Sequence, residues 1–181
     1  MQSLNSSFNA DYSINIMEVT FTRTGQRRYR VSVDGPDVVS SYMDPAPGYD
    51  ERLPHDMAHF IVENELGIKG GVFGQIAAGG AFIIPTDNTK RQKIARRRER
   101  IAHVNHKDAL LSEHVIAVTC NLWQKKTSEA PSIAGFPAEA IKRVCREFDA
   151  ASEAWTRLGV GESMTLVWHG GSGRTGRRSR R

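Results

Sequence analysis

The sequence predicts an α+β fold, in which a small antiparallel sheet packs against three to four helices. Three observations favour it. Two neighbouring segments near the N-terminus alternate apolar and polar residues, helical periodicity fills the middle of the chain, and one more alternating segment follows the last helix. Strands and helices that are segregated along the chain in this way are typical of α+β domains. We expect one domain over residues 17–169, a flexible extension over 1–16 and a disordered basic tail over 170–181.

The predicted sheet combines an N-terminal hairpin with a C-terminal strand. Apolar residues alternate with polar ones over 17–22 and again over 28–33, and turn residues at 24–26 separate the two runs. A further short strand is expected over 38–42. Residues 163–168 also alternate, and we expect them to pair with the N-terminal hairpin.

Helices account for the middle of the predicted domain. The first begins near Pro54, which a first helical turn tolerates, and stops near Gly67, which readily takes the left-handed conformation of a helix end. Residues 70–82 are apolar and bounded by glycines, so we expect a short packed helix or turn there. Residues 89–123 show helical periodicity, but one unbroken helix of that length would measure about 50 Å, too long for a small domain. We therefore place a break at Asn105, which can cap a second helix.

The clearest helix follows Pro137. Apolar residues fall on one of its faces at spacings of three and four, and Gly159 and Gly161 end it. That face is expected to lie in the core. The tryptophans are expected there too: Trp123, Trp155 and Trp168.

Composition limits the classes of protein to which the chain can belong. Of its 181 residues, 39% are hydrophobic and 25% charged, which is typical of a globular domain. No apolar run approaches the roughly 20 residues of a membrane-spanning helix, and residues 1–16 lack the basic and apolar regions of a secretory signal. The two cysteines, Cys120 and Cys145, do not have the spacing of a metal site. We expect a cytoplasmic protein without a membrane partner.

Positive charge is concentrated in two segments. Residues 90–100 contain seven basic residues and one acidic residue, and the tail contains five arginines and no acidic residue, so the remaining chain is acidic. Such segments can bind the phosphates of a nucleic acid or another polyanion, or they can pair with the acidic surface of the protein itself. The nucleic-acid-binding candidates are Lys90, Arg91, Lys93, Arg96, Arg97, Arg98 and Arg100.

Four ionisable residues share one side of the helix predicted from Pro54. Relative to His55, a helical wheel places His59 at about 40°, Glu63 at about 80° and Asp56 at about 100°. Most of the remaining circumference is apolar. We expect a largely buried helix whose polar stripe faces solvent or a cleft.

This stripe predicts a metal site. Two histidines four residues apart can bind one ion, and HDxxH is similar to the HExxH helix of metalloproteases, with an acid one methylene shorter. We expect His55 and His59 as metal ligands. Asp56 is the candidate orienting or general-base carboxylate, and Glu63 the candidate ligand or acid–base group. The helical stretch that follows is expected to supply one further ligand from among its histidines: His103, His106 and His114. Alternatively, Asp56 caps the helix and the histidines bridge it to a loop.

Three segments carry a resemblance to a family: LPHDMAHFIVENELGIKGGVFGQIAAGG, MEVTFTRTGQRRYRV and WTRLGVGESMTLVW. They are similar to a family of small uncharacterised bacterial proteins with an LPHDxxHFxxE helix signature. The resemblance covers residues 17–168 and leaves out the first 16 residues and the arginine tail. It implies a shared fold and a site on this helix. It implies no reaction, because that family has no established activity.

Three functions are compatible with these features. The leading hypothesis is a small metal-binding protein, with zinc as the preferred ion and metal-dependent hydrolysis as its reaction. The second is a module that binds nucleic acid or another polyanion through residues 90–100 and the tail. The third is a non-catalytic adaptor whose histidine helix packs against a partner protein.

Overall fold

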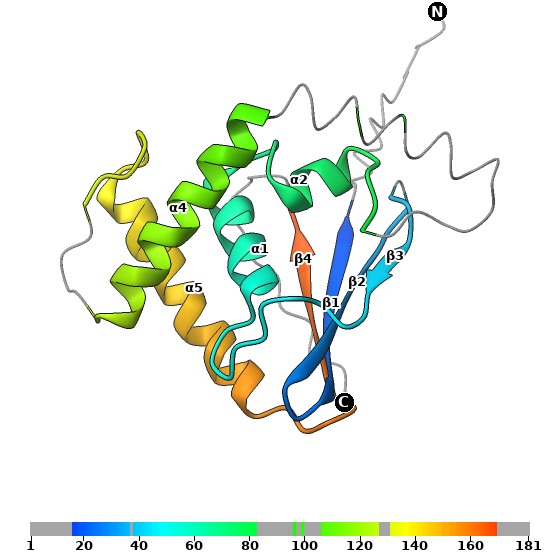
Figure 1. Ribbon diagram of the computed structural model, residues 1–181. Coiled ribbons are helices and arrows are strands. Elements are labelled where there is room, and N and C mark those ends of the chain that lie inside the picture. Colours follow the sequence, from blue (N-terminus) through cyan, green and yellow to red (C-terminus); the bar gives the residue numbers. More distant parts are fainter. Residues whose placement is uncertain are drawn as a thin grey trace, which may run out of the picture.

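The computed structural model describes most of the expected domain (Figure 1). The described residues are 16–36, 38–82, 106–126 and 131–169, together with Arg96 and Glu99. Four strands form one antiparallel sheet in the order β3-β2-β1-β4. Their bounds are Met17–Gly25 for β1, Arg28–Asp34 for β2, Ser41–Met43 for β3 and Ser163–Trp168 for β4. The predicted α+β class is confirmed, including the pairing of the C-terminal strand with the hairpin.

The third strand begins later than predicted. It was expected over 38–42, whereas β3 pairs with β2 only from Ser41 onward. The connection before it is held as a loop by Asp34, whose Oδ1 accepts hydrogen bonds from the amide of Gly35 at 2.9 Å and the hydroxyl of Ser40 at 2.6 Å. Apolar alternation alone does not reveal such a local side-chain bond.

The sheet has one buried and one polar face. Val19 of β1 pairs with Val33 of β2 and Leu166 of β4, and all three side chains are buried. On the opposite face the hydroxyls of Thr20 and Thr165 lie 2.9 Å apart. Figure 1 shows α1 (His55–Leu66), α4 (His106–Gln124) and α5 (Ala138–Thr156) to one side of the sheet. The core therefore lies between that side and the helices.

Helix α1 occupies the centre of the helical layer. It packs against α2 (Val72–Ala77), α4 and α5, and its Phe60 contacts Phe73 of α2 and Trp168 of β4 at ring-centroid distances of 5.2 and 5.9 Å. Gly67 ends it with a φ of 68°, as its position predicts.

The helix predictions are confirmed where the structure describes them. Trp123, Trp155 and Trp168 are buried, as expected. Most of the basic stretch and the expected break at Asn105 lie outside the described residues, although Arg96 and Glu99 are helical. Among the helices that are described, none is long and apolar enough to cross a membrane.

Candidate metal centre

The ionisable stripe of α1 is largely enclosed. His55 is exposed, whereas the exposed fractions of Asp56, His59 and Glu63 are 8%, 3% and 0%. Only His55 meets the expectation of a stripe that faces solvent or a cleft. The other three groups face neighbouring elements, and a buried polar group in that position needs partners.

Asp56 faces the sheet. Its Oδ2 accepts a hydrogen bond from the hydroxyl of Tyr29 on β2 at 2.5 Å, and the same hydroxyl lies 2.6 Å from the carbonyl oxygen of Pro47. Burial raises the pKa of Asp56, and burial together with the charge of Asp56 raises the pKa of Tyr29 above its ordinary range. No side-chain bond caps α1 within the described chain. Asp56 therefore fastens the first turn of α1 to the sheet instead of capping the helix.

Glu63 faces α2 and α4. Its two carboxylate oxygens accept hydrogen bonds from the amides of Val72 and Phe73, both at 2.8 Å, and from the hydroxyl of Ser112 at 2.9 Å. The amide of Gly74 lies 3.4 Å from Oε2. These donors satisfy a carboxylate that has no contact with solvent, and they also satisfy amides of the first turn of α2.

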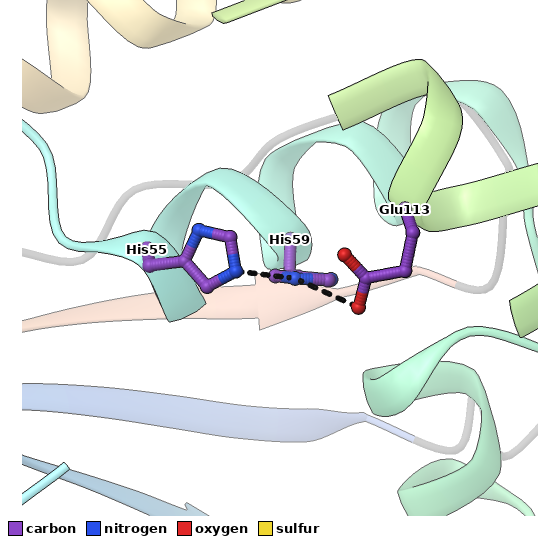
Figure 2. Close-up of side chains that lie close together, drawn as sticks. All are labelled: His55, His59 and Glu113. Atoms are coloured by element: carbon purple, nitrogen blue, oxygen red, sulfur yellow. Dashed lines mark hydrogen bonds and ion pairs between the residues drawn. The ribbon is translucent and has the colours of Figure 1, made fainter. Parts of the chain in front are cut away.

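The two histidines of the stripe lie close to Glu113 of α4 (Figure 2). The Nε2 atoms of His55 and His59 lie 3.0 Å apart, and Nε2 of His59 lies 3.6 Å from Oε1 of Glu113. One ligand atom from each of the three residues lies within 4.8 Å of the others. Figure 2 shows both histidines on α1 and the glutamate reaching them from α4.

These distances fit a divalent metal ion. Two ligand atoms, each about 2.1 Å from a tetrahedral zinc ion, lie about 3.4 Å apart. The two separations measured from Nε2 of His59, 3.0 Å to His55 and 3.6 Å to Glu113, lie on either side of that value. The side chain of Glu113 is 60% exposed and His55 is exposed, so two of the three groups are open to solvent.

Glu113 is the group that the sequence did not predict. The expected third ligand was a histidine of the same helix, but His114 is exposed and lies outside the converging group, while His103 and the side chain of His106 lie outside the described residues. A search among the carboxylates of the long helix would have included Glu113, although nothing local distinguishes it from Asp108. Glu113 reaches the histidines only because α4 packs on α1.

The remaining candidates contribute little to this centre. Except for Arg96, whose side chain is exposed, the basic candidates of residues 90–100 lie outside the described chain, so polyanion binding stays a prediction.

Burial raises the pKa of the Cys120 thiol to about 11 and also raises the pKa of Cys145. Neither cysteine is therefore activated as a thiolate.

Comparison of the chain with protein-family models, with curated proteins and with solved structures finds no match. The resemblance carried by the LPHDxxHFxxE segment thus stays a prediction.

Proposed function

We propose that the protein binds one divalent metal ion, preferably zinc, through His55, His59 and Glu113. The proposed reaction of this site is metal-dependent hydrolysis. The observation that supports this most directly is the convergence of three ligand atoms within 4.8 Å from two different helices. Imidazole and carboxylate are the donor types of catalytic zinc sites.

The open geometry favours catalysis over a structural role. Structural zinc sites are closed by four protein ligands, whereas catalytic sites use three and leave a position for water. A bound zinc ion lowers the pKa of that water to about 7, which supplies hydroxide at neutral pH. The exposure of His55 and Glu113 gives water and a substrate access to the ion.

Asp56 acts in this proposal as a positioning residue. It follows His55 directly, and its hydrogen bond to Tyr29 fixes the first turn of α1 against β2. Because Asp56 is only 8% exposed, it orients the backbone that carries His55 more readily than it reaches a substrate.

Metal content is the first test. The full chain, purified without chelator or histidine tag and supplied with zinc, is expected to retain about one ion per molecule by elemental analysis. The double variant His55→Ala/His59→Ala and the single variant Glu113→Gln are expected to lose it. His114→Ala is the matched control, because it removes an exposed histidine one residue from Glu113 and outside the converging group.

The outcomes separate clearly. A wild-type protein that binds neither zinc, iron nor manganese overturns the proposal. Two histidines and one carboxylate also suit Fe(II), so iron in place of zinc would keep the site and replace hydrolysis with redox chemistry. If zinc is bound, hydrolysis of activated ester and peptide substrates should disappear in Glu113→Gln and persist in His114→Ala.

A further inference from the structure

Glu63 lies between His59, a proposed metal ligand, and the first turn of α2. Its Oε1 is 3.5 Å from Nδ1 of His59 and 2.8 Å from the amide of Val72, while Oε2 is 2.8 Å from the amide of Phe73. One buried carboxylate therefore contacts a ligand ring on one side and a helix start on the other.

The approach of this carboxylate to α2 depends on Gly71. A Cβ atom at that position would lie 2.2 Å from Cδ and Oε1 of Glu63, far inside any van der Waals contact. Gly71 has an extended backbone, with a φ of −74° and a ψ of −173°, that any residue can adopt. The glycine is thus required by the space that Glu63 occupies rather than by its own conformation.

Nδ1 of His59 is the unsatisfied atom in this arrangement. It is buried and makes no hydrogen bond with any described residue, and its contact with Oε1 of Glu63 is 3.5 Å long. A carboxylate facing Nδ1 favours the tautomer with the proton on that nitrogen, which leaves the Nε2 lone pair directed at His55 and Glu113.

We propose that Glu63 is a positioning residue that couples metal binding at His59 to the first turn of α2. The inference rests on the proposed metal site. If His59 bound the metal through Nε2, its Nδ1–H would be a stronger donor, and the 3.5 Å contact with Glu63 would shorten into a hydrogen bond. The carboxylate is then held more firmly against Val72 and Phe73. Because coupling is reciprocal, an ordered α2 raises the affinity for the metal in turn.

The variant test compares two changes at the same carboxylate. Glu63→Gln replaces one acceptor oxygen by a donor and is expected to lower zinc affinity roughly 10- to 100-fold, measured by competition with a chromogenic chelator. Ser112→Ala removes another hydrogen bond to Oε1 without touching His59, and is expected to leave zinc affinity within about threefold of wild type. Equal affinities for Glu63→Gln and wild type overturn the coupling.

A second measurement needs no variant and covers the case in which Glu63→Gln does not fold. Zinc should slow hydrogen exchange at the amides of Val72 and Phe73 in the wild-type chain by more than it slows exchange at Val31 in β2. If zinc binds stoichiometrically but these amides respond no more than Val31, the coupling is wrong and the metal site stands. If zinc does not bind at all, the proposed function fails and the coupling fails with it.

Discussion

His55 and His59 meet through their Nε2 atoms, 3.0 Å apart, with their rings edge to face at a centroid distance of 4.6 Å. His55 is exposed, whereas His59 is only 3% exposed. Their hydrogen bond therefore joins a surface residue to a buried one. In the proposed metal site, both Nε2 atoms would bind the ion instead of sharing this hydrogen bond.

The two histidines should therefore differ in their contribution to stability without metal. We expect His59→Ala to lower the free energy of unfolding by about 1–3 kcal/mol, because it empties a buried site, and His55→Ala to change it by about 0.5 kcal/mol or less. Urea unfolding in the presence of a chelator measures both. Equal losses in the two variants would contradict the enclosure of His59.

Tyr29 should be a stability determinant through its hydroxyl. Tyr29→Phe leaves the buried carboxyl of Asp56 without its hydrogen-bond donor, so we expect a loss of about 1–3 kcal/mol in urea unfolding. Tyr42→Phe is the matched control, since Tyr42 is 55% exposed and its ring contact with Arg30 does not need the hydroxyl. A Tyr29→Phe variant as stable as the control would show that the bond contributes nothing.

Gly71 should tolerate no side chain. In Gly71→Ala the new methyl group collides with the carboxylate of Glu63, and we expect a loss of about 1–3 kcal/mol in thermal or urea unfolding. Gly159→Ala should stay within about 0.5 kcal/mol of wild type, because its Cβ would lie 3.5 Å from the nearest atom, Oε2 of Glu162. Unchanged stability in Gly71→Ala would contradict the requirement for glycine that the Glu63 carboxylate sets at this position.

Asp44 should make unfolding sensitive to acid. Its Oδ1 accepts hydrogen bonds from Arg28 and its Oδ2 from Arg30, and bonds from Arg30 are the largest cause of a pKa below the ordinary 3.8. A lowered pKa in the folded state gives stability that is present above pH 3.8 and is lost as the pH falls further. Asp44→Asn should therefore show a smaller loss of stability below that pH than wild type.

Urea midpoints across the acid range, at low and high salt, measure this effect. Added salt should narrow the difference between Asp44→Asn and wild type, because both arginines are about half exposed. Identical acid profiles for the two proteins would contradict the role given to the pair of arginines.

The sequence predicts most of the fold because its signals are local. Alternation over β1, β2 and β4 and the helical periodicity of α5 each depend on residues a few positions apart. The start of β3 was misplaced because hydrogen bonds from Gly35 and Ser40 to Asp34 extend the preceding loop. The alternation of apolar and polar residues does not predict such bonds.

The candidate site was predicted in part for the same reason. His55 and His59 are one helical turn apart, so their proximity follows from the sequence alone. Glu113 lies 50 or more residues away from both, and only the packing of α4 on α1 brings it to them. The predicted stripe included Glu63, but the sequence did not predict that amides of α2 would donate hydrogen bonds to its carboxylate.

The position of β1 also bears on how the chain folds. It lies between β2, its neighbour in sequence, and β4, and the bond between Thr20 and Thr165 spans 145 residues. Until Ser163–Trp168 emerges from the ribosome, one edge of the hairpin has no partner strand and is exposed to association with other chains. Sheet completion must therefore follow synthesis of nearly the whole domain. Such long-range pairing slows folding relative to helical bundles of similar size.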